Sequence, residues 1–409
     1  MSHLAINGGT PFRNELFSSW PVYDEREKEA FVKELEKIQW GIDSPSIAAF
    51  EERFAEYCGA KYAVACTNGT DAIFIALQAL GVKAGDEIIV PPYTFIATAI
   101  AVLMANAIPV FADIDPDTFN IDPESIKTKI TPRTKAIIPV HIAGNPANLD
   151  AICDIAREHN LQVMEDAAQA IGAEWQGQRV GSIGDAGTFS FQTSKNLASG
   201  EGGAIVTNNE QLAKRIRTFT NCGRVEGGAW YDHHEVAGNH RLGGFQAAVL
   251  LVGLERIDAQ MKKREDNARY LASLLDDIEG ISLTGSYPGT TRHAYHLGII
   301  KYNAEAFKGL PKKRFVQVLE KEGVECADGY LPLYNYHIFK NFSEKVSAYK
   351  EIYQGRVDYS AVQCPVCERL CEHEAVWIFQ EMFLGTHKDM DDIANAILKI
   401  QRYADEAFV

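Results

Sequence analysis

Short apolar segments alternate with helical segments along the first half of the chain, and this alternation limits the folds open to it. Strand-like patterns cover residues 61–66, 87–90, 108–113, 136–141 and 162–165. Helix-like patterns cover 24–38, 46–57, 72–80, 95–105, 123–129 and 147–159. An alternation of this kind predicts an α/β fold, in which a mainly parallel sheet carries helices on both faces.

Polar and aromatic residues follow several of the predicted strands. In a parallel sheet the carboxyl ends of the strands meet at one edge, and ligands bind beyond that edge. The sequence therefore predicts that residues from separate parts of the chain meet at one rim: Thr70, Tyr93, Phe95, His141, Asp166, Gln169, Ser190 and Lys195.

Lys195 follows an apolar run with Phe189 and Phe191, and a glycine-rich turn (200–203, GEGG) comes after it. Burial of a lysine lowers its pKa and makes the amine a nucleophile toward carbonyl groups. Lys195 is thus a candidate for covalent catalysis through a Schiff base. The alternative is a surface lysine at the end of a strand.

Gly69 and Thr70 lie where a strand turns into a helix, which is a geometry suited to a phosphate. Asp166 ends another strand, where its carboxylate could hold a protonated ring nitrogen, and Phe95 could stack on the ring. These groups match the needs of pyridoxal 5′-phosphate (PLP). Taken singly, each has an ordinary alternative: helix caps for the turn and for Asp166, and a core aromatic for Phe95.

The composition excludes several other classes of protein. The 409 residues carry a net charge of −15, which disfavours nucleic acid or an anionic membrane as the main partner. No stretch reaches the roughly 18 apolar residues of a membrane span, and the N-terminus has no secretory pattern, so we expect a cytoplasmic protein. Scattered cysteines fit a reducing compartment. For Cys364, Cys367 and Cys371 we expect ordinary buried thiols rather than a metal site.

A long helical pattern over 245–278 divides the chain. We expect a large domain over 1–244, a bridging helix over 245–278 and a smaller α+β domain over 279–409. His296, Tyr336 and His337 in the last region are candidate substrate contacts, with packing as the alternative.

The motifs resemble those of the DegT-type sugar and cyclitol aminotransferases, which are fold-type I PLP enzymes. The match extends over nearly the whole chain. Its segments are 4–9 (LAINGG), 67–72 (TNGTDA), 94–98 (TFIAT), 139–144 (PVHIAG), 165–169 (EDAAQ), 190–195 (SFQTSK) and 238–242 (GNHRL). The resemblance implies a large domain with a seven-stranded, mainly parallel sheet, and a smaller α+β domain.

The resemblance also implies roles for individual residues. Lys195 would be joined to the PLP aldehyde, and Asp166 would pair with the pyridine nitrogen. Phe95 would stack on the ring and Gln169 would touch its phenolic oxygen. The phosphate would be bound by Gly69, Thr70, Asp71 and Ser190, and by Asn239 of the partner subunit in a homodimer.

One departure from the family pattern stands at Gly243 and Gly244, where the family usually has a Ser or Thr and an acidic residue. We expect the hydrogen bonds near these two glycines at the dimer interface to differ from those of the family.

Within the family, the chain is most similar to glutamine-dependent scyllo-inosose aminotransferases and aminohydroxybenzoate synthases. The implied reaction moves an amino group from glutamate or glutamine to a keto-cyclitol or keto-sugar. A nucleotide-linked keto-sugar is the alternative acceptor. A sugar dehydratase is disfavoured because those relatives replace the lysine with histidine, and a non-catalytic regulator is disfavoured by the full set of cofactor residues.

Overall fold

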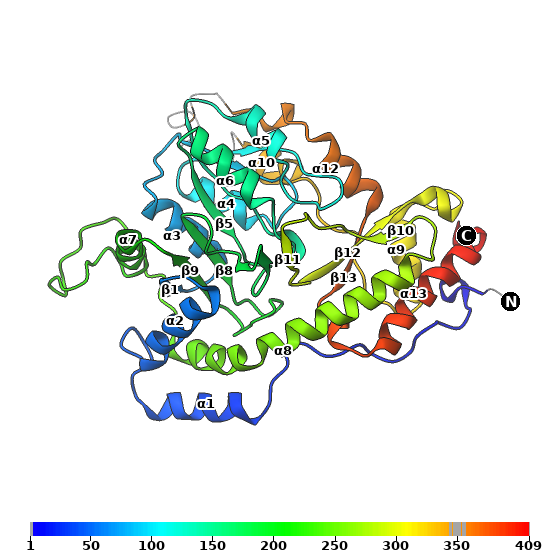
Figure 1. Cartoon of the computed structure of the whole chain (residues 1–409), viewed down its shortest axis with the longest axis horizontal. Coiled ribbons are helices and arrows are strands. Elements are labelled where there is room, and N and C mark those ends of the chain that lie inside the picture. Colours follow the sequence, from blue (N-terminus) through cyan, green and yellow to red (C-terminus); the bar gives the residue numbers. More distant parts are fainter. Residues whose placement is uncertain (1–2, 343–345, 347–352, 354–356, 409) are drawn as a thin grey trace.

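The computed structural model describes residues 3–342, 346, 353 and 357–408. At its centre is a seven-stranded sheet in the order β1-β9-β8-β5-β4-β2-β3 (Figure 1). These strands are β1 (Tyr62–Cys66), β2 (Glu87–Val90), β3 (Ile108–Phe111), β4 (Thr134–Ile137), β5 (Gln162–Asp166), β8 (Ala186–Ser190) and β9 (Gly203–Thr207). Only β9 runs against its neighbours, β1 and β8, so the predicted mainly parallel sheet is confirmed.

Helices cover both faces of this sheet. They are α2 (Pro45–Cys58), α3 (Gly69–Ala79), α4 (Ala97–Met104), α5 (Pro123–Lys129), α6 (Leu149–Glu158) and α7 (Glu210–Thr220). Successive side chains of a strand point to opposite faces. Ile88 and Val90 therefore pack with α3, α4 and α7, while Ile89 between them packs with α5 and α6.

A 32-residue helix, α8 (Gly244–Leu275), links the two ends of the molecule (Figure 1). Near its start, Leu250 and Leu254 are buried with α2 and the sheet. Near its end, Leu271 and Leu275 are buried in a separate cluster of C-terminal residues. One face of α8 thus contributes to two hydrophobic cores, as expected for the helix predicted over 245–278.

The C-terminal region has an antiparallel three-stranded sheet in the order β10-β12-β13. Its elements are β10 (Ile281–Leu283), β12 (Leu297–Tyr302), α9 (Lys312–Lys321), α10 (His337–Lys340), α12 (Pro365–Arg369), β13 (Ala375–Phe379) and α13 (His387–Arg402). A third small sheet joins the two regions, because β11 (Thr290–Arg292) pairs with β6 (Glu174–Trp175), which also pairs with β7 (Gln178–Arg179).

The N-terminal residues, which we expected to group with the large domain, contact the C-terminal region instead. Leu4 is fully buried in the C-terminal core. Arg13 is buried and forms ion pairs of 2.7 Å with Asp389 and 2.6 Å with Asp392 of α13. The chain then runs to α1 (Glu25–Glu36), which packs on α8.

Element boundaries differ from the sequence expectation in many places, and three of these differences lie next to predicted site residues. Helix α3 begins at Gly69 because Asn68 caps it, accepting from the N–H of Asp71. Strand β4 ends at Ile137, since Pro139 has no N–H for the ladder, although Val140 still bridges to Asp166. Strand β8 ends at Ser190, five residues before Lys195, which lies in a loop.

The thiols of Cys364, Cys367 and Cys371 are buried, as predicted. The Sγ atoms of Cys367 and Cys371 lie 3.8 Å apart. No cluster of three or more potential metal ligands occurs among the residues that the structure describes.

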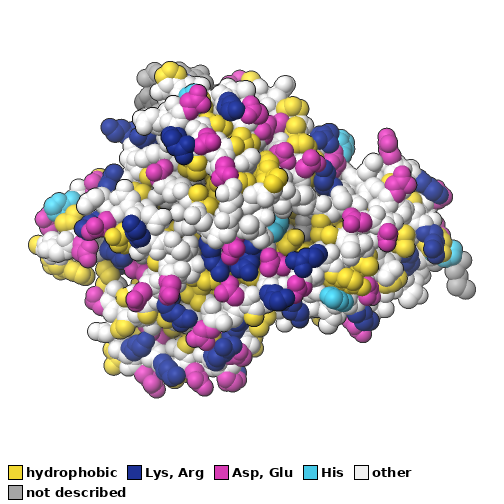
Figure 2. Space-filling model, viewed as in Figure 1, with side chains coloured by type: hydrophobic (Ala, Val, Ile, Leu, Met, Phe, Trp, Pro, Cys, Tyr) yellow, Lys and Arg dark blue, Asp and Glu magenta, His cyan; other side chains and the backbone are white. Residues whose placement is uncertain are grey.

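The visible surface mixes acidic and basic side chains (Figure 2). Within the described part of the chain, no helix is both long enough and apolar enough to cross a membrane.

Candidate active site

A cavity of about 1060 Å³ lies where the carboxyl ends of the sheet strands meet the C-terminal region. It brings together nine residues predicted from the sequence: Gly69, Thr70, Asp71, Phe95, Asp166, Gln169, Ser190, Lys195 and His296. Asn239, Tyr336 and His337 are not among its lining residues, and both Asn239 and His337 are exposed.

One end of the cavity is formed by the start of α3. The N–H groups of Gly69 and Thr70 open the helix, and neither has a partner within the described structure. A Cβ atom at Gly69 would lie 2.7 Å from the Cβ of Ser190 and 3.2 Å from its Oγ. Only glycine therefore lets the helix start this close to β8, which places the Ser190 hydroxyl beside the free N–H groups. Such an arrangement suits a phosphate.

Asp71 lines the cavity and also has a role within the loop itself. Its N–H donates to Asn68, and its carboxylate accepts from the hydroxyl of Thr67 and from Asn68 at 3.1 Å. The same carboxylate lies 3.0 Å from Nδ1 of His240. Asp71 thus orders the loop and ties it to the segment that carries Asn239.

Asp166, at the end of β5, is buried within the cavity wall. Its Oδ2 accepts from Thr98 Oγ1 at 2.8 Å, and its Oδ1 accepts from the Ala168 N–H at 3.2 Å. Burial raises the pKa of the Asp166 carboxyl above its ordinary value, while these hydrogen bonds and the charge of Lys195 act in the opposite direction. A cationic ligand atom would stabilise the charged form.

Lys195 lies in the loop between β8 and β9. Burial lowers the pKa of its amine to about 8, and the nearby Asp166 carboxylate opposes this shift. The Gln192 side chain shapes the loop, because its Oε1 accepts from both N and Oγ of Ser194 at 2.8 Å. The environment therefore favours a nucleophilic amine near neutral pH, as predicted from the sequence.

The remaining wall is partly aromatic. Gln169 Oε1 accepts from the Ala143 N–H at 2.7 Å, so its amide nitrogen faces Tyr330 Oη at 3.3 Å. Tyr330 packs against Trp377, with ring centroids 4.4 Å apart. Phe95 remains 56% exposed, which leaves its ring free to cover a ligand.

His296 is buried where β12 begins, and its Nδ1 lies 3.2 Å from Oδ1 of Asn196. Burial lowers the pKa of the imidazole well below its ordinary value, and the charges of Lys195 and Arg264 add to the shift. His296 is therefore neutral at physiological pH and can hydrogen-bond without adding charge to the cavity.

Several lining residues were not predicted from the sequence: Trp20, Glu201, Tyr330, Trp377, Gln380 and Glu381. Most come from the N-terminal segment or the C-terminal region, where no strand-end rule applies. The sequence contains no motif or periodicity that marks these residues as part of a site. Glu201 is the exception, because it lies within the glycine-rich turn.

The departure at Gly244 has a structural reason. A Cβ atom at Gly244 would collide with the carboxylate of Glu34 and would lie 2.7 Å from Ser44 Oγ. Glu34 is fully buried and accepts from Ser46 Oγ at 2.6 Å. An acidic side chain from α1 therefore occupies the space at the start of α8, and glycine is required there.

The chain is similar to known proteins over nearly its whole length. A putative L-glutamine:3-amino-2,3-dideoxy-scyllo-inosose aminotransferase of Streptoalloteichus tenebrarius is 39% identical, over 99% of each chain. The structure of 3-amino-5-hydroxybenzoic acid synthase superposes with a TM-score of 0.85 at 32% identity, covering 95% of this chain and 100% of that one. NtdA from Bacillus subtilis, solved with the cofactor PMP bound, gives 0.80 at 27%, covering 95% and 86%. Residues 22–397 match the DegT/DnrJ/EryC1/StrS family, so the chain belongs to this aminotransferase family.

Proposed function

We propose that this chain transfers the amino group of L-glutamine to a keto-cyclitol, with PLP as its cofactor. The observation that carries the proposal is one cavity that joins a half-buried amine of lowered pKa, a buried carboxylate and a helix start with free N–H groups. Lys195, Asp166 and the pair Gly69 and Thr70 supply these three features.

The residues fit the cofactor group by group. The phosphate fits the N–H groups of Gly69 and Thr70 and the hydroxyl of Ser190, a space that a Cβ at position 69 would invade. The ring nitrogen fits Asp166, and the aldehyde fits Lys195. When bound, PLP supplies an electron sink for the carbon that gains or loses the amine.

The chain itself contributes charge placement and proton transfer. Asp166 would keep a proton on the ring nitrogen of bound PLP, and Thr98 holds the carboxylate through its 2.8 Å hydrogen bond. Lys195 Nζ is the group that accepts and returns the proton of the substrate carbon, because its pKa of about 8 allows both states near neutral pH. Phe95 and Tyr330 line the cavity and would help to exclude water from a bound ring.

The charge of the cavity favours an uncharged acceptor. Among the described residues that line it, Lys195 is the only lysine or arginine, whereas Glu201 and Glu381 add carboxylates. The diphosphate of a nucleotide-linked sugar would need cationic partners. A keto-cyclitol needs only hydrogen bonds, which His296 and Tyr330 can make. The relative from S. tenebrarius carries an aminocyclitol ketone and L-glutamine in its name, which supports the same choice.

We further propose that the enzyme is a homodimer with shared sites. Asn239 lies outside the cavity of its own chain and is exposed, which suits a residue that serves a neighbouring subunit. The segment before it also exposes apolar side chains, with Tyr231 at 85% and Val236 at 98%. These surfaces would become buried in the dimer.

A two-step absorbance experiment tests the proposal. Purified enzyme is mixed with L-glutamine, L-glutamate or L-alanine, and loss of the PLP aldehyde band reports the first half of the reaction. The amine-loaded enzyme then receives scyllo-inosose, 2-deoxy-scyllo-inosose or a nucleotide-linked keto-sugar, and return of the band reports the acceptor. We expect glutamine and a keto-cyclitol to act fastest. Return of the band only with the nucleotide-linked sugar would refute the acceptor assignment.

A further inference from the structure

The two backbone carbonyls just before Lys195 accept hydrogen bonds from distant parts of the chain. The Thr193 carbonyl accepts from Trp20 Nε1 at 2.7 Å. The Ser194 carbonyl accepts from Gln380 Nε2 at 2.8 Å. Trp20 belongs to the N-terminal segment and Gln380 directly follows β13, so both donors lie outside the sheet domain that carries Lys195.

Arg264 of α8 connects these two donors. Its Nη2 donates to Gln380 Oε1, and its guanidinium carbon lies 5.3 Å from the centroid of the Trp20 ring. Arg264 is fully buried, and its Nε and Nη1 have no hydrogen-bond partner within the described structure. Burying a cation with so few hydrogen bonds costs folding free energy, which indicates that the contacts of Arg264 with Gln380 and Trp20 have a functional role.

The chemistry of the contacts fixes the orientation of the Gln380 amide. A guanidinium can only donate hydrogen bonds and a backbone carbonyl can only accept them. The amide oxygen of Gln380 must therefore face Arg264, and the amide nitrogen must face Ser194. The reverse orientation would place donor against donor and acceptor against acceptor. Arg264 thus keeps Gln380 in the one orientation that holds the carbonyl before Lys195.

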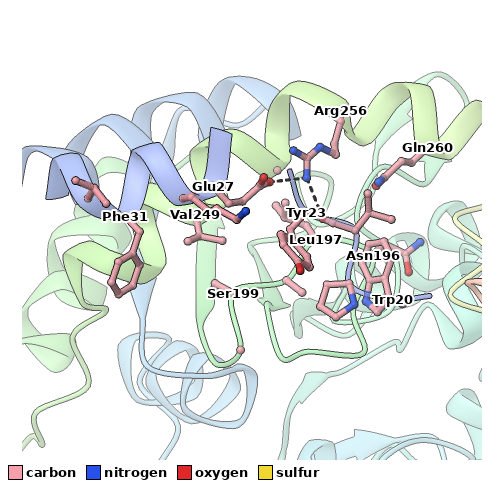
Figure 3. Close-up of a pocket in the computed structure, with 17 residues that line it drawn as sticks. Trp20, Tyr23, Glu27, Phe31, Asn196, Leu197, Ser199, Val249, Arg256 and Gln260 are labelled. Atoms are coloured by element: carbon pink, nitrogen blue, oxygen red, sulfur yellow. Dashed lines mark hydrogen bonds and ion pairs between the residues drawn. The ribbon is translucent and has the colours of Figure 1, made fainter. Parts of the chain in front are cut away.

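The loop needs this support because it has open volume on both sides. Lys195 faces the large cavity, while Asn196, Leu197 and Ser199 face a second, mainly apolar cavity of about 480 Å³ (Figure 3). Trp20 lines both cavities. Asn196 and Leu197 are buried, whereas Thr193 and Ser194 on the other side of Lys195 are exposed. Hydrogen bonds to the carbonyls of Thr193 and Ser194 therefore contribute to fixing the part of the loop that packing does not hold.

We propose that Trp20, Arg264 and Gln380 form a clamp that positions Lys195 for attack on the cofactor's aldehyde. The three residues are positioning residues, since they act on Lys195 through the carbonyls of the residues before it. The clamp joins the N-terminal segment, α8 and the C-terminal region to the reactive amine. It rests on the proposed function, in which Lys195 is the residue that PLP joins.

Gln380→Glu separates positioning from simple packing. Glutamate has the same shape and still satisfies Arg264, but it cannot donate to the Ser194 carbonyl. If the only role of Gln380 were to accept the hydrogen bond of Arg264, this change would not affect Lys195. Asn267→Asp is the matched control, because Asn267, like Gln380, has a buried side-chain amide that donates to backbone carbonyls. Asn267 lies on α8 and donates to Phe383 at 2.7 Å and Gly385 at 3.0 Å, away from the Lys195 loop.

The full-length protein is freed of cofactor, and two quantities are measured in each variant. The affinity for pyridoxamine 5′-phosphate, which has no aldehyde to join Lys195, reports whether the cofactor site is intact. The first-order rate of covalent attachment of saturating PLP, taken at its high-pH plateau, reports the position of the free amine. The plateau removes any change in the Lys195 pKa caused by the new carboxylate.

We expect Gln380→Glu to slow attachment about tenfold or more while pyridoxamine phosphate binding stays within twofold of wild type. Asn267→Asp should lower the unfolding temperature and leave both quantities unchanged. Wild-type attachment rates in Gln380→Glu would overturn the clamp, as would equal slowing in Asn267→Asp. If wild-type protein attaches no PLP at Lys195, the proposed function fails instead, so the two failures are distinguishable.

Discussion

Replacing Gly69 by alanine tests the proposed phosphate site with a single methyl group. The new Cβ would lie 2.7 Å from the Cβ of Ser190, whereas carbon atoms in contact normally lie about 3.5–4.0 Å apart. The start of α3 must therefore move by roughly 1 Å from β8. Gly69 has an ordinary helical backbone, since no positive φ is found there, so the substitution causes no backbone strain.

The expected loss of cofactor affinity follows from the size of this overlap. Forcing an extra methyl group into a packed site typically costs about 1–3 kcal/mol. Because each 1.4 kcal/mol is a factor of ten, PLP should bind about 5- to 150-fold more weakly. Alanine is the better helix former by up to about 1 kcal/mol, which offsets part of the cost to folding. Cofactor affinity should therefore fall more than stability does.

A double-mutant cycle identifies the cause. In a Ser190→Gly background the nearest strand atom to the new methyl group is the Cα at 3.4 Å, an ordinary contact. Gly69→Ala should then cost almost nothing beyond the loss already caused by removing the Ser190 hydroxyl. The dissociation constant for PLP reports cofactor affinity in each variant of the cycle, and the unfolding temperature of the cofactor-free protein reports its stability. If Gly69→Ala binds PLP within twofold of wild type, the contact between α3 and β8 does not form the phosphate site.

Three further predictions concern the reactive groups. In cofactor-free protein, labelling of Lys195 by an amine reagent should rise with pH to a midpoint near its pKa of about 8, because the free amine exists only above the pKa; a midpoint near 10.5, as for exposed lysines, contradicts burial. Asp166→Ala should retain PLP but transfer amino groups roughly 100-fold more slowly or worse, measured in single turnovers, and near wild-type rates would refute its role. Mixed dimers of the inactive variants Lys195→Ala and Asn239→Ala should regain part of the activity, because one of the two shared sites then carries neither defect. Mixed dimers that stay inactive would show that Asn239 does not serve its neighbour.

The sheet domain was predictable from the sequence because local pattern and fold agree there. The predicted strand over 87–90 and helix over 123–129 have the observed bounds. The rule that ligands bind at the carboxyl ends of parallel strands also brought Asp166 and Lys195 to one cavity. Errors arose where a single residue changes the local geometry, as Pro139 does by ending the β4 ladder.

The far wall of the site was not predictable in the same way. Trp20 and Gln380 reach the cavity from segments separated by most of the chain, and neither stands in a pattern that marks a site. Their importance comes from tertiary contacts to two carbonyl groups, which sequence periodicity does not encode. Asp71 shows a different case: the family motif predicts a role in phosphate binding, and the structure adds contacts through which Asp71 orders the loop.

The opposite pKa shifts of Lys195 and Asp166 explain why the cavity suits a cofactor with several charges. Burial lowers the pKa of the amine and raises that of the carboxyl, so it disfavours the charged form of both groups. A ligand that brings a protonated ring nitrogen to Asp166 restores the charged carboxylate, and one that brings an aldehyde to Lys195 uses the free amine. In the proposed function, the phosphate of such a ligand would accept hydrogen bonds from the N–H groups of Gly69 and Thr70. A bound ligand therefore gives Lys195 and Asp166 each a specific partner that offsets the cost of their desolvation. Burial of these two groups is unfavourable without a ligand, and it makes the site selective for a ligand that supplies both partners.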